Sequence, residues 1–174
     1  MIYFILTFIF LMTTHELSHI FMAKACGMRI KKIGFTCKPL PHVYVSVIEN
    51  NLSLLKRILF MISGNFTTIF FFMIGLLYFD VPRIIYFAFA FQIIIELNPF
   101  YSDYSLLLSY IKAHSKLKIT FLQNKKYPTK EEINIMYKKE NQEHLYSKEW
   151  YWHLFIWAMI IIILLSPKFI ISLI

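Results

Sequence analysis

Long apolar stretches alternate with short polar segments along the chain. The apolar stretches run over residues 2–23, 58–79, 84–97 and 150–165. Because a helix needs about 20 residues to cross the hydrocarbon core of a bilayer, this pattern predicts an all-α membrane protein with about four transmembrane helices. The third stretch is short and continues through Asn98 and Pro99 toward Leu108. A proline inside a membrane helix frees a carbonyl group, so this break is expected to face protein or a polar cavity and not lipid.

The segments between the apolar stretches show two different patterns. In the first loop, Val43, Val45 and Val47 alternate with Tyr44 and Ser46, which predicts one or two short β-strands between the first two helices. Residues 112–148 are rich in lysine and glutamate and are expected to form a solvated helical loop. We therefore divide the chain into a membrane core over residues 1–110, a charged cytoplasmic loop over residues 111–149 and a C-terminal transmembrane helix over residues 150–174.

The composition supports a location in the membrane. Of the 174 residues, 58% are hydrophobic, which is more than a soluble domain of this size could bury in one core. The formal net charge is +8, and the positive charges cluster in the loops that follow the first and third stretches. Such clusters mark cytoplasmic loops, so both termini are expected to face outward. The cations flank apolar spans and form no separate basic helix, so nucleic-acid binding is not expected.

The first apolar stretch carries the sequence His15-Glu16-Leu17-Ser18-His19, an HExxH motif. On a helix, residues four apart lie on nearly the same face, so the two imidazoles can bind one zinc ion. Glu16 would lie beside them as the catalytic acid/base, taking a proton from the attacking water and passing it to the leaving amine. A charged group near the bilayer centre costs about 2.5–3.5 kcal/mol, which favours a functional interpretation. A polar patch buried between helices is the structural alternative.

A catalytic zinc site also needs a third protein ligand and an open position. Asp103 is the best candidate, because it follows the break at the inner end of the third stretch. At about 1.5 Å of rise per residue, His19 lies roughly 8 Å outward of Lys24, and Asp103 lies roughly 13 Å outward of Lys112. The two side chains can therefore meet at one depth in the membrane. Glu96 could be a ligand only if the break is placed differently.

Together these motifs resemble the site-2 protease family of intramembrane metalloproteases, in which a membrane-embedded HExxH and a later Asn-Pro…Asp element supply the zinc site. The matching segments are residues 15–19 and residues 98–103. The resemblance implies a core of three helices, with residues 56–68 as part of the second, and a small sheet that dips toward the active site. It covers residues 1–110, and the small size of the chain resembles the compact bacterial members, such as the sporulation sigma-factor-processing proteases.

Two features of the second motif depart from the family pattern. Tyr104 follows Asp103 where the family has glycine, and the gap between Pro99 and Asp103 is one residue shorter than usual. The role of Asn98 is open between donating to the substrate carbonyl or developing oxyanion and capping the broken helix. The strand over residues 43–47 is likewise open between an edge that binds an extended substrate and a plug of the cytoplasmic loop.

The expected function is that of an intramembrane zinc metalloprotease, located in a bacterial cytoplasmic membrane as a multi-pass protein with its active site toward the cytoplasm. Its expected partners are the lipid bilayer, a membrane protein or peptide substrate and, where cleavage is controlled, a regulatory membrane protein. One alternative is a non-catalytic relative that binds a partner or metal, which the Asp103-Tyr104 pair favours. Another is a small transporter or channel subunit, but its polar residues would recur through several spans, whereas here they gather at one depth.

Overall fold

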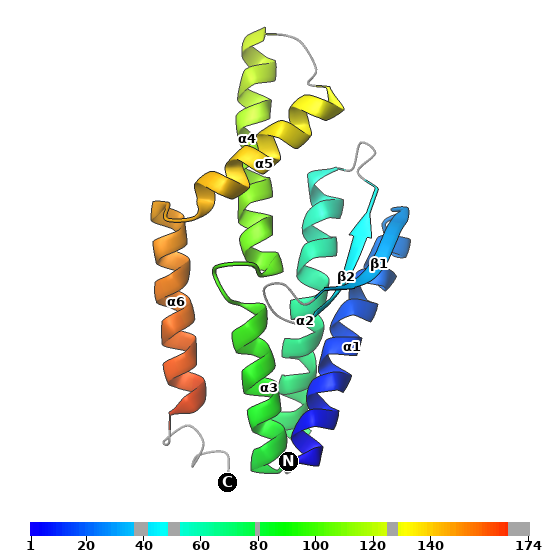
Figure 1. Cartoon of the computed structure of the whole chain (residues 1–174), viewed down its shortest axis with the longest axis vertical. Helices are drawn as coiled ribbons and strands as arrows, with labels where there is room; N and C mark the ends of the chain where they lie inside the picture. The colour runs from blue at the N-terminus through cyan, green and yellow to red at the C-terminus, as the bar shows by residue number, and fades with distance from the viewer. Residues whose placement is uncertain (37–41, 49–52, 79–80, 125–128, 167–174) are drawn as a thin grey trace. The chain divides into compact units, whose positions relative to one another are not determined.

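The computed structural model describes residues 1–36, 42–48, 53–78, 81–124 and 129–166 (Figure 1). Six helices and one pair of strands make up this part of the chain. In chain order they are α1 (Ile2–Ala25), β1 (Ile30–Thr36), β2 (His42–Val47), α2 (Leu54–Tyr78), α3 (Arg83–Glu96), α4 (Asp103–Asn124), α5 (Lys130–His144) and α6 (Lys148–Leu165). The chain forms two compact units, which are described separately: Met1–Glu96 with Ile160–Ile174, and Leu97–Met159.

The predicted fold class, an all-α membrane protein with a small β element between its first two helices, is confirmed. Within the described residues, α1, α2 and α6 are long and apolar enough to cross a membrane. The third apolar stretch forms α3, which has 14 residues and ends at Glu96, so the count of four spans stays a prediction. The helix ends there because the following Asn98-Pro99 pair disfavours continued helix. The three-part functional division of the chain also remains a prediction.

Helices α1, α2 and α3 pack against one another in the first unit, as Figure 1 shows. A pair of aromatic rings lies in contact between each two of these helices. Rings with centroids 5–6 Å apart stabilise the packing beyond the burial of their apolar area. The pairs are Phe8–Phe91 at 5.5 Å, Phe72–Phe89 at 5.7 Å and Phe10–Phe71 at 5.8 Å.

The buried and exposed faces of α1 are reversed relative to a soluble helix. Leu11, His15, His19 and Ala23 are its buried residues, and their spacing of four places them along one face. Its outward side is strongly apolar and includes Ile5, Leu6, Ile9, Phe10 and Phe21. Polar groups inside and apolar groups outside are what a lipid environment favours.

A glycine turn leads the chain from α1 into the hairpin. Gly27 has a φ of 68°, a left-handed conformation that glycine adopts without steric cost. The Gly27 amide donates to the Lys24 carbonyl, and the Met28 amide donates to the Ala23 carbonyl, which is the Schellman pattern of helix termination. Strands β1 and β2 then pair antiparallel, with Ile33 opposite Val45, and β2 packs against α1.

In the second unit, α4 packs against α5. The carboxylate of Glu140 on α5 is buried and accepts a hydrogen bond from Lys116 on α4. Helix α5 begins with a capping box, in which Thr129 accepts from the Glu132 amide while the Glu132 carboxylate accepts from the Thr129 amide. The described parts of the predicted helical loop, residues 112–124 and 130–144, are therefore helical, and residues 125–128 lie outside the described residues.

Candidate metal centre

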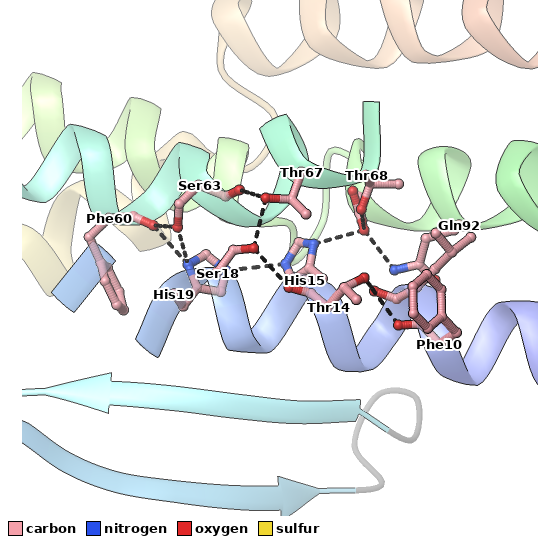
Figure 2. A network of polar contacts seen from close by, with 12 residues as sticks. Phe10, Thr14, His15, Ser18, His19, Phe60, Ser63, Thr67, Thr68 and Gln92 are labelled. Carbon is pink, nitrogen blue, oxygen red and sulfur yellow. Dashed lines mark hydrogen bonds and ion pairs between the residues drawn. The ribbon is translucent and has the colours of Figure 1, made fainter. Parts of the chain in front are cut away.

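Helix α1 places the two histidines of the HExxH motif side by side in the interior of the first unit. His15 is 8% exposed and His19 is 4% exposed. The Nδ1 atom of His15 lies 2.7 Å from Glu96 Oε1 on α3, and the Nδ1 atom of His19 lies 2.7 Å from the Phe60 carbonyl oxygen on α2. Figure 2 shows the contact between His19 and Phe60. The two contacts fix both rings from the side opposite to their Nε2 atoms.

The hydrogen-bond partners determine which nitrogen of each ring carries the proton. A carbonyl oxygen only accepts, so His19 Nδ1 must donate to Phe60 and its Nε2 carries a lone pair. We assign the same tautomer to His15, whose Nδ1 faces the Glu96 carboxylate. The two Nε2 atoms lie 3.1 Å apart, close to the spacing of about 3.3 Å that two nitrogens at 2.0–2.1 Å from a tetrahedral zinc would have. The donor type, the tautomers and the spacing therefore fit a zinc ion.

Gly64 on α2 allows the His15 ring to lie directly against the α2 backbone. A Cβ atom at position 64 would lie 2.7 Å from His15 Cδ2 and would overlap its Cε1 and Nε2 atoms. Real Cβ atoms essentially never make contacts below 3.0 Å. A side chain larger than hydrogen at this position would consequently displace the ring.

A second set of hydrogen bonds ties α1 to α2 beside the imidazoles (Figure 2). Ser18 on α1 donates to Thr67 on α2 at 2.7 Å, and Ser63 donates to the Phe60 carbonyl at 2.8 Å while lying 3.1 Å from His19 Nδ1. Small hydroxyl residues at helix interfaces let backbones approach and provide such bonds in membranes. Ser63 and Thr67 therefore serve the packing of α1 against α2.

Glu16, the predicted acid/base, lies half-buried on α1 beside His15. Successive residues on a helix are separated by about 100°, so its side chain leaves the helix at the flank of the histidine face. This position agrees with a role next to the imidazoles, and the role itself stays a prediction.

Asn98, a predicted catalytic residue, and Asp103, the predicted third metal ligand, belong to the second unit. Asn98 is buried, and its Oδ1 accepts from the backbone amides of Phe100 and Tyr101 at 3.0 and 2.9 Å. This oxygen therefore stabilises the turn that follows α3, and the choice between a capping and an oxyanion role stays open. Its amide nitrogen can donate as well, so these two bonds do not exclude the oxyanion role.

Asp103 is the first residue of α4 and is half-buried. The preceding Ser102 accepts from the Ser105 amide at 3.2 Å, which is the contact of an N-cap residue. The loop over residues 97–102 thus ends in a helix N-cap, which fixes the backbone position of Asp103.

Side chains from α6 and α4 donate to three carbonyl groups of the loop over residues 97–102. His153 Nε2 donates to the Leu97 carbonyl at 2.8 Å, and Trp150 Nε1 donates to the Pro99 carbonyl at 3.0 Å. The Asn98 carbonyl accepts from Ser105 at 3.3 Å. The expectation that protein groups surround the proline break is therefore confirmed, since Pro99 is also fully buried.

Two residues of these networks have roles that the sequence did not reveal. The sequence presents Glu96 only as an alternative ligand, and its contact with His15 joins positions 81 residues apart. Its presence within an apolar run was the available signal. His153 resembles an interfacial residue in the sequence, and no local pattern indicates that it bonds the Leu97 carbonyl.

The fold and the histidine pair define a helical membrane protein with the donor set of a metallopeptidase. The model of peptidase family M50 matches residues 3–165, so the chain belongs to this family, the site-2 protease family. The family consists of metallopeptidases that are in general zinc-dependent. The match extends beyond residues 1–110, the part of the chain that the two motifs cover. No curated protein and no solved structure matches the chain significantly.

Proposed function

We propose that this chain is an intramembrane zinc metalloprotease that hydrolyses peptide bonds of membrane-embedded or membrane-associated proteins. The observation that carries the proposal is the pair of Nε2 atoms 3.1 Å apart, both oriented by bonds on their Nδ1 side. Membership in peptidase family M50 supports the same conclusion independently.

We further propose that His15, His19 and Asp103 hold the zinc ion. Two neutral imidazoles and one carboxylate are a ligand set found at catalytic zinc sites, where a fourth position remains open. The capped start of α4 supports Asp103 as the third ligand, because it fixes the backbone that carries the carboxylate. When bound, the zinc ion supplies Lewis-acid chemistry that polarises the scissile carbonyl and acidifies the attacking water.

In this proposal Glu16 accepts a proton from the attacking water and later donates it to the leaving amine. Its place beside His15 on a rigid helix supports that role. Asn98 is a second proposed catalytic residue, whose amide nitrogen can donate to the substrate carbonyl or to the developing oxyanion. The fixed turn that its Oδ1 stabilises supports this role, since it limits the motion of the side chain.

The proposed substrate is a membrane-spanning segment that unwinds before cleavage, because a helix hides its backbone from attack. The proposed location is a bacterial cytoplasmic membrane with the site toward the cytoplasm, which the clustered positive charges of the loops support. A regulatory membrane protein that controls cleavage is a further proposed partner.

Cleavage of a panel of single-span membrane proteins in reconstituted vesicles tests the proposal. Glu16→Gln should retain zinc and lose cleavage by about 10²–10⁴-fold, the usual contribution of a general acid–base group. Glu131→Gln makes the same chemical change at an exposed glutamate of α5 and should cleave like the native chain. Equal cleavage by the native chain and Glu16→Gln would contradict the mechanism. A native chain that binds zinc and cleaves nothing would favour the non-catalytic alternative.

A further inference from the structure

Glu96 is a buried acidic residue whose place the HExxH motif does not explain. It lies at the end of α3, and its side chain is 5% exposed. Its Oε1 atom accepts three hydrogen bonds, from His15 Nδ1 at 2.7 Å, from Thr68 Oγ1 at 2.6 Å and from Gln92 Nε2 at 2.6 Å. The donors come from α1, α2 and α3, so all three core helices meet at this oxygen. Figure 2 shows the three donors, His15, Thr68 and Gln92.

We propose that Glu96 is a positioning residue for the metal centre, which fixes the tautomer and orientation of His15 and strengthens it as a zinc ligand. The inference rests on the proposed zinc site, because its effect passes through His15 Nε2. A carboxylate that accepts from the far nitrogen of a ligating histidine makes the imidazole more basic.

The contact differs from the one that holds the other histidine. His19 donates to the neutral carbonyl of Phe60, whereas the acceptor facing His15 is a carboxylate. Two neutral imidazoles do not balance the charge of a divalent cation. A buried carboxylate bonded to one of them therefore stabilises the zinc-bound site electrostatically.

A purely structural tie between helices explains this carboxylate less well. An amide side chain could accept the same hydrogen bonds, and it would avoid the cost of placing a charged group in the membrane. Thr68 is fully buried and Gln92 is 4% exposed, so both are dedicated to the interior. Their bonds hold the carboxylate oxygen in the direction of the His15 ring.

The dissociation constant of Zn²⁺ tests the inference, measured by chelator competition on the purified native chain and on Glu96→Gln. The substitution should weaken zinc binding by about 10–100-fold, the range known for such partners of ligating histidines. Tyr86→Phe is the matched control, because it removes a buried hydrogen bond from α3 to the Leu164 carbonyl and leaves the cluster intact. It should lower thermal stability and leave the dissociation constant unchanged.

Thr68→Val is a second variant that nearly preserves side-chain shape and removes one bond to the same oxygen. It should weaken zinc binding by less than Glu96→Gln does, and it tests the inference even if Glu96→Gln does not fold. Zinc affinities of both variants within twofold of the native value would overturn the role of Glu96 while leaving the zinc site intact. A native chain that binds no zinc would instead contradict the proposed function itself.

Discussion

Replacing Gly64 by alanine should damage the metal centre through a single methyl group. The new Cβ would lie 2.7 Å from His15 Cδ2, whereas ordinary van der Waals contact begins at 3.4 Å. The ring must therefore move by at least about 0.7 Å, because a close-packed interior offers no free volume to absorb the overlap. A displacement near 1 Å at a catalytic group can cost about 10²-fold in rate. We expect weaker zinc binding and a loss of cleavage of that order.

The same helix provides a matched control for this substitution. At Gly75, among the residues that the structure describes, an added Cβ would meet Val81 Cγ2 at an ordinary 3.4 Å. Both substitutions favour helix formation by about 1 kcal/mol, so a general effect of alanine on α2 would appear in both variants. Zinc affinity and cleavage rate should fall in Gly64→Ala and stay native in Gly75→Ala. Native zinc affinity and cleavage in Gly64→Ala would refute the close approach of Gly64 to the His15 ring.

Three further predictions concern the break, the charged loop and the metal. His153→Phe removes the donor to the Leu97 carbonyl, at a cost of about 1–3 kcal/mol. Thermal stability and cleavage should both fall. Unchanged values would contradict a stabilising role for the hydrogen bond from His153 to Leu97. Burial lowers the pKa of His144 from 6.5, with nearby His153 and Lys112 adding to the shift. The neutral His144 ring therefore contributes its full stability above about pH 6.5, and this contribution is lost as the pH falls below that value. Hydrogen exchange of α5, corrected for intrinsic rates, should be faster at pH 5.5 than at pH 7.5. The substitution His144→Phe should remove this difference. Chelation should abolish cleavage and lower the midpoint of thermal unfolding, and Zn²⁺ should restore both; cleavage that survives complete zinc removal would contradict a metal-dependent reaction.

The features that the sequence predicts well depend on short spacings. The pair His15 and His19 shares one face because helical geometry alone places residues four apart together. The hairpin follows from the alternation around Val43–Val47, and the end of α3 follows from the backbone restrictions of Asn98-Pro99. Each of these properties is local, so a single segment carries the necessary information.

The features that the sequence does not predict depend on contacts between distant segments. The bond from His15 to Glu96 and that from His153 to Leu97 span 81 and 56 residues. A polar side chain within an apolar stretch needs a hydrogen-bond partner when it is buried. The sequence does not say which residue provides that partner. The close approach of Gly64 to His15 is also invisible in the sequence, since glycine serves many purposes in membrane helices.

We propose that Asp103 completes the zinc site of His15 and His19. X-ray absorption of the zinc-loaded Asp103→Cys variant tests it most directly, because a thiolate ligand scatters at a distance of about 2.3 Å that nitrogen and oxygen ligands do not reach. Tyr104→Cys is the neighbouring control. We predict zinc–sulfur scattering in Asp103→Cys and none in the native chain or in Tyr104→Cys. Zinc bound by nitrogen and oxygen alone in Asp103→Cys, with native affinity, would contradict the claim.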